Sequence, residues 1–389
     1  MEYEYGEKII IATHELVYGV PQALKDYLLK KKCKQLLFIV LPFIVTEKSS
    51  CTLYKEGLKV NEKTFRRKKR VGILDFFIDF FQIIWWVYKN GEKYDVFIGV
   101  NNLNSLAGLF LKKIGRVEKV VFYTMDFVPI RFENKILNYV YHKIEKICVK
   151  RCDETWNVSP RMAGGREEYL GLSKNKYPQR VVPVGTWNDN IKKRSFKEIK
   201  KNQILFIGHL LEKQGIQIIL ESLPQVIKKI GDVRFLIVGG GDYENAIKKT
   251  VEKLKLEKNV IFTGWILDRK KIDEMLSENM IAVATYKPEK KPLHNFTYFA
   301  DPYKIKDYLG AGLPIVMTDI SYNVKEIADA GCGVIVKYDK DDIAKAIIKL
   351  LKDEERYKKY RQNALNFAKQ YDWTAIYDKV FNQKQEVIA

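Results

Sequence analysis

The stretch that most constrains the fold covers residues 300–318 and reads Ala-Asp-Pro-Tyr-Lys-Ile-Lys-Asp-Tyr-Leu-Gly-Ala-Gly-Leu-Pro-Ile-Val-Met-Thr. Pro302 suits the first turn of a helix, because the N–H that proline lacks would be unpaired there in any case. Residues 303–309 therefore predict a short helix that stops at Gly310. Residues 313–317 are apolar and partly β-branched, which is typical of a fully buried strand.

On this predicted helix, Lys304 and Asp307 lie three residues apart and share one face. Such a pair can serve a nucleotide sugar. Lys304 and the helix N-terminus would neutralise phosphate oxygens, and Asp307 would accept hydrogen bonds from ribose hydroxyls. The alternative is a solvated ion pair, worth about a few tenths of a kcal/mol. The spacing alone favours the ion pair.

The wider string, from Asp307 through Gly312 and Pro314 to Val316, resembles the donor-binding segment of GT-B glycosyltransferases, particularly glycosyltransferase family 4. That family usually has two glutamates eight positions apart. Asp307 matches the second, whereas the first falls on Phe299, and Asp301 is expected to substitute for it. The resemblance implies an α/β protein of the GT-B class, with two doubly wound Rossmann-like domains that face a central cleft.

Composition sets further limits on the class of protein. The chain has 389 residues, of which 47% are hydrophobic, and this suits two globular domains. Its formal net charge of +20 indicates an anionic partner. Five scattered cysteines form no zinc pattern and are expected to be buried thiols in a reducing cytosol. The sequence shows no signal-peptide core, and no apolar run of about 18 residues that would span a membrane.

The first domain is expected over residues 1–188. A strand at 8–13 and a helix at 22–30 form its first unit, and ligands bind outside the carboxyl ends of such strands. The resemblance places Gly19, in the loop between them, close to the donor phosphates, although a lone glycine is more often a turn residue. Polar residues near the expected strand ends are the candidate acceptor contacts: His14, Asn101, Asn102 and Arg131.

Asp126 is the first acid beyond the predicted strand at 119–123. A carboxylate at this edge of the sheet could remove the proton of an acceptor hydroxyl. Family 4 retaining enzymes often have a histidine near this point, whereas some inverting GT-B relatives use an aspartate. We therefore expect Asp126 to be the catalytic base; the alternative is a loop-capping role.

A basic run at 66–70 precedes an aromatic stretch at 71–88. This combination suits a helix in the headgroup region of an anionic bilayer. The alternative is a core helix that covers the sheet, and core packing is favoured for the apolar residues. The basic run is kept as a membrane contact, and both interpretations can hold together.

After a linker at 189–202, a second domain is expected over 203–371, followed by a C-terminal helix at 372–389 that crosses back to the first domain. The strand at 204–208 and the following loop resemble the family's diphosphate-binding segment. His209 stands at the usual Arg, and Gln214 at the usual Lys. The residues expected to bind the donor are Gly19, Gly208, His209, Lys213, Gln214, Gly239, Gly240, Trp265, Tyr286, Asp301, Tyr303, Lys304 and Asp307.

The resemblance therefore implies transfer of a sugar from a nucleotide diphosphate sugar, with a UDP-sugar favoured, to a hydroxyl of a lipid-linked or polysaccharide-precursor acceptor. No cofactor or metal is expected, because fixed positive charge can stabilise the leaving diphosphate. We expect a cytoplasmic protein, peripheral on the inner face of the cell membrane. The sugar, the linkage and the stereochemical outcome stay open.

Three other functions stay open. A GT-B-fold epimerase would share the donor pocket but act without an acceptor. A non-catalytic nucleotide-sugar-binding protein would bind donor without turnover. A nucleic-acid-binding protein would explain the charge, but the sequence contains no recognition motif for it and nucleic acid is not an expected partner.

Overall fold

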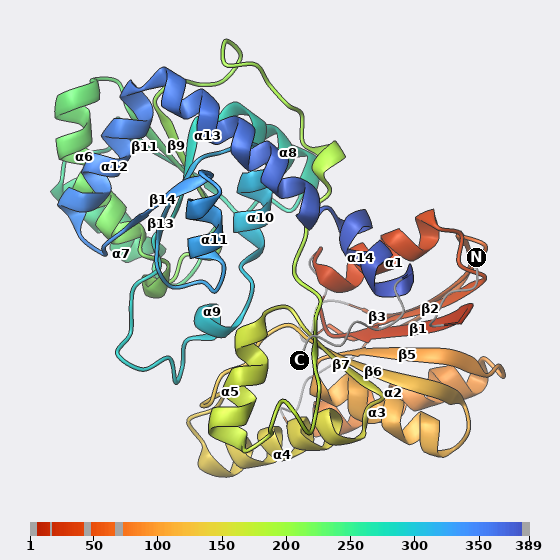
Figure 1. The fold of residues 1–389 in the computed structure, drawn as a ribbon. Helices are drawn as coiled ribbons and strands as arrows, with labels where there is room; N and C mark the ends of the chain where they lie inside the picture. Colours follow the sequence, from red (N-terminus) through yellow and green to blue (C-terminus); the bar gives the residue numbers. More distant parts are fainter. Residues whose placement is uncertain (1–5, 16–17, 43–47, 67–72, 383–389) are drawn as a thin grey trace. The chain divides into compact units, whose positions relative to one another are not determined.

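A computed structural model of the chain describes residues 6–15, 18–42, 48–66 and 73–382. The chain divides into two compact units, each with its own sheet (Figure 1). Unit 1 contains Met1–Pro183, Leu293–Ala300 and Trp373–Ala389, and unit 2 contains Val184–Pro292 and Asp301–Asp372. The expected α/β architecture with parallel sheets is therefore present in both units.

Unit 1 has an eight-stranded sheet in the order β4-β3-β2-β1-β5-β6-β7-β8. β1 pairs in parallel with β2 on one side and with β5 on the other, so the strand order reverses beside β1. The antiparallel hairpin β3–β4 adds two strands next to β2. The strands are β1 (Lys8–Thr13), β2 (Gln35–Val40), β3 (Ser49–Lys55), β4 (Leu58–Phe65), β5 (Tyr94–Val100), β6 (Val117–Thr124), β7 (Glu154–Asn157) and β8 (Arg180–Val181).

Helices cover both faces of this sheet. In Figure 1, α1 and α14 lie together on one face, and α2 and α3 lie on the other. The core beneath α2 and α3 is apolar and aromatic, and includes Ile83, Trp86, Phe97 and Leu111. The helices of unit 1 are α1 (Val20–Lys30), α2 (Ile73–Lys89), α3 (Asn102–Lys113), α4 (Lys135–Arg151), α5 (Pro160–Leu170), α9 (Phe296–Phe299) and α14 (Trp373–Asn382).

The segment Leu293–Ala300 groups with unit 1, whereas the sequence placed it inside the second domain. Aromatic packing explains the difference. Phe299 lies edge-to-face on Phe127, with ring centroids 5.1 Å apart, and its carbonyl accepts a hydrogen bond from the Ser159 hydroxyl. The Arg161 guanidinium lies 4.2 Å from the centroid of the Tyr298 ring.

Unit 2 has a six-stranded, fully parallel sheet in the order β11-β10-β9-β12-β13-β14, so its strand order reverses beside β9. The strands are β9 (Gln203–Ile207), β10 (Arg234–Val238), β11 (Val260–Gly264), β12 (Ile281–Ala284), β13 (Ile315–Thr318) and β14 (Gly333–Val336). The α-helices are α6 (Ile216–Ile230), α7 (Glu244–Lys253), α8 (Arg269–Glu278), α10 (Tyr303–Gly310), α11 (Val324–Asp329), α12 (Lys340–Lys352) and α13 (Glu354–Phe367). Short 3₁₀ turns are η1 (Asn188–Asn190), η2 (Glu212–Gln214) and η3 (Ala368–Tyr371).

The opening prediction for residues 300–318 is confirmed, because α10 runs directly into β13. Gly312 has φ +72, and the Leu313 N–H closes the turn on the Tyr308 carbonyl. β13 is buried along its whole length. Since α10 follows the carboxyl end of β12, its first turn lies at the edge of the sheet where ligands of doubly wound folds bind.

The basic run at 66–70 falls largely outside the described residues, whereas most of the aromatic stretch forms α2. Among the helices that the structure describes, none is both long and apolar enough to cross a membrane.

Candidate functional site

The side chain of Lys304 is the centre of the candidate site in unit 2. Its ammonium donates to the Gln214 side-chain carbonyl at 2.6 Å. It lies 4.0 Å from the centroid of the Phe206 ring and 5.0 Å from that of Tyr286. A Cβ added to Gly208 would lie 3.5 Å from the ammonium. The structure thus brings four of the expected donor residues together beyond the carboxyl ends of β9 and β12.

Burial against aromatic rings lowers the pKa of Lys304 to about 7. The hydrogen-bond partner of the ammonium is a neutral amide, which does not balance the positive charge. A bound anion would restore the ordinary protonation of Lys304. The geometry therefore suits a phosphate ligand.

The N-terminus of α6 lies beside this lysine. Gly215 precedes the helix with φ +73, and a Cβ there would lie 1.7 Å from the Thr285 carbonyl oxygen, so glycine is required. No side chain caps α6, which leaves the N–H groups of its first turn without a side-chain acceptor. These groups and the helix dipole favour an anion at this position.

Lys213 occupies a different place from Gln214. Its carbonyl accepts from the Lys287 N–H at 3.0 Å. The residue lines an open depression of about 390 Å³ together with Leu211, Glu212, Lys287 and Glu289. Gln214 therefore bonds the Lys304 ammonium, whereas Lys213 lines the depression.

Two exposed aromatic rings lie together at the ends of neighbouring loops, one after β9 and one after β11. The His209 and Trp265 ring centroids are 5.4 Å apart, and Trp265 is 60% exposed. A Cβ on Gly240 would meet the Trp265 indole nitrogen at 2.7 Å, and one on Gly239 would meet the Gly208 carbonyl at 1.9 Å. The glycines thus allow close backbone approach, and the open indole face suits stacking of a nucleotide base.

The Asp307 carboxylate accepts more hydrogen bonds than a solvent-exposed ion pair would give it. Both of its carboxylate oxygens accept from the Arg269 guanidinium, at 2.8 and 2.9 Å, and the Thr186 hydroxyl donates to Oδ1 at 2.7 Å. The predicted ion pair with Lys304 is wrong, because Lys304 turns to Gln214 instead. A ribose contact through Asp307 must use the lone pair left on Oδ2.

The sequence reasoning missed Arg269. It lies 38 residues before Asp307, so no local spacing signals the pair. Burial opposes the charge on Arg269, but the Asp307 carboxylate outweighs this effect and raises the pKa of the guanidinium. Tyr303 is near enough to Arg269 to interact with it electrostatically.

Asp301, expected to bind the donor, is enclosed in the interior of unit 2. Its Oδ1 lies 3.1 Å from the Lys306 ammonium, and both side chains are fully buried. Its Oδ2 accepts from the Val184 N–H at 3.0 Å, and Lys306 also lies 3.7 Å from the centroid of the Tyr371 ring. Contact with a donor would require this pair to open. The packing gives Asp301 a structural role that the sequence did not predict.

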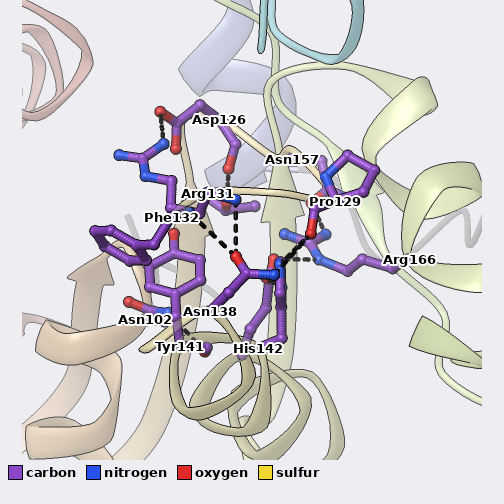
Figure 2. A network of polar contacts seen from close by, with 12 residues as sticks. Asn102, Asp126, Pro129, Arg131, Phe132, Asn138, Tyr141, His142, Asn157 and Arg166 are labelled. Carbon is purple, nitrogen blue, oxygen red and sulfur yellow. Dashed lines mark hydrogen bonds and ion pairs between the residues drawn. The ribbon is translucent and has the colours of Figure 1, made fainter. Parts of the chain in front are cut away.

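In unit 1, the structure brings two of the predicted site residues together. The Arg131 guanidinium forms an ion pair with the Asp126 carboxylate (Figure 2). Burial opposes the charge on Arg131, and the neighbouring Asp126 outweighs it and raises the pKa of the guanidinium. The Asn138 side chain fixes this loop by accepting from the Arg131 N–H and donating to the Pro129 carbonyl. Asp126 and Asn138 thus both contact this loop, and the loop-capping alternative for Asp126 stays open.

A buried polar network packs against the loop that contains Asp126 and Arg131. His142 bonds the Pro129 carbonyl at 2.9 Å (Figure 2). Its other ring nitrogen lies 3.0 Å from the Glu145 carboxylate. Arg166 donates to Glu145 at 2.8 Å and to the Asn157 side chain at 2.6 Å. These bonds join α4, α5 and β7, so they hold the Asp126 loop on rigid elements.

Glu15 is a second acid that the sequence reasoning missed. It follows β1, the strand beside which the strand order reverses. Burial, and then the charge of Asp126, raise the pKa of Glu15 to about 7. A carboxyl group that changes charge near neutral pH at this edge of the sheet is a candidate functional residue. The Thr13-His14-Glu15 string was its only signal in the sequence.

The other residues predicted for this side lie mostly inside unit 1. His14 is held between the Asn104 amide at 3.0 Å and Asp79 at 3.4 Å. The Asn102 amide donates to the Tyr141 carbonyl, and Asn102 is 3% exposed. Both would have to rearrange to contact an acceptor.

The two remaining predicted residues bond to local backbone and helix groups. Asn101 accepts from the Met125 N–H, and the Gly19 N–H donates to the Gln22 side chain at the start of α1. Among the described residues, no group of three His, Cys, Asp or Glu side chains is arranged to hold a metal ion.

The Asp301–Lys306 pair predicts a stability effect. Lys306→Met leaves a buried carboxylate without its cation and should lower the free energy of unfolding by about 3–5 kcal/mol. Adding Asp301→Asn removes that uncompensated charge and should recover at least half of the loss. Urea unfolding of the three chains measures this. An unaffected Lys306→Met variant would contradict the structural role.

Glu15 predicts a pH effect with a defined sign. The raised pKa means that, between pH 4.5 and about 7, the folded chain keeps a proton that the unfolded chain has lost. The free energy of unfolding therefore falls as pH rises through this window. Glu15→Gln cannot ionise, so its stability relative to the native chain should rise by up to about 3 kcal/mol across the window.

The measurement is urea unfolding of both chains at pH values below and above the window. Glu133→Gln, an exposed acid of the same unit, is the control. A stability difference that stays constant with pH would show that Glu15 ionises alike in the folded and unfolded chains.

Comparison with known proteins adds to this geometry. Residues 188–367, slightly less than half of the chain, match the family model described as glycosyl transferases group 1. A poly(glycerol-phosphate) alpha-glucosyltransferase of Bacillus subtilis is 25% identical over 174 residues, covering 44% of this chain and 24% of that protein. A phosphatidyl-myo-inositol mannosyltransferase of Mycolicibacterium smegmatis is 25% identical over 175 residues, covering 44% of this chain and 42% of that protein. The chain thus spans less than half the length of these relatives.

Solved structures match nearly the whole chain. HepE from Anabaena in complex with UDP superposes with a TM-score of 0.70 at 15% identity, covering 96% of this chain and 98% of that chain. A sucrose-phosphate synthase from Thermosynechococcus elongatus gives a TM-score of 0.74 at 16% identity, covering 96% of each chain. The chain therefore has the GT-B fold and resembles the group 1 glycosyltransferases over its second unit.

Proposed function

We propose that the chain is a glycosyltransferase that moves a sugar from a nucleotide diphosphate sugar, with a UDP-sugar favoured, to a hydroxyl of a lipid-linked or polysaccharide-precursor acceptor. The observation that carries this proposal is the position of Lys304. Its ammonium lies beside Gly208 and Gln214 without a carboxylate among its hydrogen-bond partners, near the uncapped N-terminus of α6.

The proposed chemistry on unit 2 is stabilisation of the leaving diphosphate. Negative charge grows on the diphosphate as the bond to the sugar breaks, and preorganised donors stabilise that charge. Lys304 supplies a cation and α6 supplies N–H groups, so the reaction is proposed to need no metal ion. Asp307, oriented by Arg269, would accept from the ribose, and Trp265 would stack on the base.

On unit 1, Asp126 is proposed to take the proton of the acceptor hydroxyl. Its ion pair with Arg131 orients the carboxylate beyond the carboxyl end of β6, the edge of the sheet where an acceptor hydroxyl would bind. The polar network under the loop would keep Asp126 in a fixed position.

The nature of the acceptor is inferred from relatives. Their names include phosphatidyl-myo-inositol mannosyltransferase and, for Streptococcus pneumoniae, alpha-monoglucosyldiacylglycerol synthase. Both names describe enzymes that act on lipids. With a net charge of +20, the chain is proposed to work as a peripheral protein on the anionic inner face of the cell membrane.

A thermal-shift screen of nucleotides and nucleotide sugars tests the proposal. A ligand that binds the folded chain raises the melting midpoint, and UDP and one UDP-sugar should do so. Release of UDP only when a lipid extract is added would distinguish transfer from epimerisation or from binding without turnover. A screen in which no nucleotide raises the midpoint would contradict the proposal.

Lys304 predicts that UDP binding is coupled to protonation. With its pKa near 7 in the free chain, Lys304 must take up a proton to pair with the diphosphate at higher pH. The dissociation constant of UDP should therefore rise about tenfold per pH unit above pH 7. Lys304→Met should weaken UDP binding roughly 10- to 100-fold at pH 7 and remove this pH dependence.

Calorimetry of UDP binding in buffers of different ionisation enthalpy measures the proton uptake directly. Lys345→Met changes the net charge equally but alters an exposed lysine of α12, so it should leave both quantities unchanged. If Lys345→Met and Lys304→Met have equal effects, Lys304 is not the phosphate ligand.

Asp126 predicts a separate effect on turnover. Asp126→Asn removes the proposed base and should lower kcat by about 100-fold or more, with little change in UDP affinity. Glu133→Gln alters an exposed acid seven residues later and is the control. Steady-state release of UDP with the donor and lipid extract chosen above checks this, and full activity of Asp126→Asn would exclude the base role.

A further inference from the structure

Helix α2 has its acidic residues on the side that faces the core of unit 1, together with buried apolar residues. Ile83, Trp86 and Val87 pack into the core of unit 1, as the core-helix interpretation expected. Asp75 and Asp79 lie on the same inward side and are 3% and 2% exposed. The described inward face thus holds the carboxylates together with the buried apolar residues.

The opposite side of α2 is apolar and open to solvent. At about 100° per residue, its exposed apolar residues fall within an arc of about 100°. They are between 43% and 63% exposed, and Phe110 of the neighbouring α3 is 41% exposed. Phe80 connects the two helices, since its ring lies 5.9 Å from that of Phe110. We call this surface the aromatic face: Phe77, Ile78, Phe81, Trp85, Tyr88 and Phe110.

Cations lie at the border of the aromatic face. The Lys89 ammonium is 4.8 Å from the centroid of the Trp85 ring, and the Arg116 guanidinium is 4.8 Å from that of Tyr88. An occupant of this surface must therefore accept aromatic side chains in its interior and offer negative charge at its border.

We propose that the aromatic face inserts into the headgroup boundary of an anionic bilayer, with Lys89 and Arg116 on lipid phosphates. Tryptophan and tyrosine favour this boundary, because their rings are apolar and their N–H and O–H groups remain hydrated. Insertion of about 5–10 Å is usual for an amphipathic helix in this position. A second copy of the chain fits less well, since a two-fold interface would bring two positively charged borders together.

This inference refines the membrane contact of the proposed function by assigning it to particular residues. It is tested with the full chain and vesicles alone, without donor or acceptor. Failure of vesicle binding would therefore leave the transferase proposal standing, and failure of the transferase assays would not affect the vesicle result.

The first experiment uses tryptophan quenching by brominated lipid in vesicles of phosphatidylglycerol and phosphatidylcholine. Bromine placed near the glycerol end of the acyl chain should quench fluorescence more than bromine near the methyl end. Trp85→Phe should lose most of this quenching. Trp265→Phe, which removes another exposed tryptophan, should keep it. Equal quenching losses in the two variants would overturn the proposal.

The second experiment measures vesicle co-sedimentation of a Phe77→Ser/Phe81→Ser variant. Its partition coefficient should fall roughly tenfold or more, because binding scales with the apolar area that inserts. Leu58→Ser/Val60→Ser changes two exposed apolar residues of β4 and should bind like the native chain. Binding should also weaken in vesicles of phosphatidylcholine alone and at high salt.

Analytical ultracentrifugation without lipid tests whether a second copy of the chain covers the aromatic face instead of a bilayer. A dimer that Phe77→Ser/Phe81→Ser dissociates, together with no vesicle binding by the native chain, would show that a second copy covers the aromatic face. A monomer that binds anionic vesicles through this face is the result that the proposal predicts.

Discussion

The central interaction of the structure is an ammonium group whose hydrogen-bond acceptor is a neutral amide. Lys304 and Lys306 lie two residues apart on α10, yet their surroundings differ. Lys306 is buried against the carboxylate of Asp301, so its charge is balanced within the unit. Lys304 is enclosed by Phe206 and Tyr286 and bonds to Gln214. Because no carboxylate balances the charge of Lys304, the site favours the binding of an anion.

The rest of unit 2 positions this charge. The Gly310–Gly312 turn lets α10 enter β13, and the Asp301–Lys306 pair anchors the start of the helix to Val184. Arg269 fixes Asp307 on the same helix. Gly215 allows α6 to start against Thr285, which brings a second source of positive potential beside Lys304. A rigid arrangement of this kind is suited to stabilising charge that develops on a leaving group.

The sequence predicted the parts of the site that follow local rules. Alternating strands and helices predicted the fold, and Pro302 with the glycines after Leu309 predicted the helix that carries Lys304. Gly208 and Gln214 were expected from the resemblance to glycosyltransferase family 4. The sequence did not predict pairs between side chains that lie far apart along the chain. Arg269 meets Asp307 across 38 residues. No spacing rule shows that Asp301 pairs with Lys306 while Asp307, equally buried, pairs with Arg269. Glu15 was missed because its altered pKa comes from burial and from Asp126, both of which depend on the folded sheet.

The structure also explains why α2 was difficult to interpret. Its composition favoured a core helix but also suited a membrane-surface helix, and only the three-dimensional structure separates its two sides. One side completes the core of unit 1, and the other leaves aromatic rings exposed between cations.

The most direct test of the central claim is an experimental structure of the chain with UDP bound. A β-phosphate oxygen within about 3 Å of the Lys304 ammonium, with another facing the first N–H groups of α6, is the predicted result. A diphosphate bound away from both groups, with Lys304 still on Gln214, would contradict it.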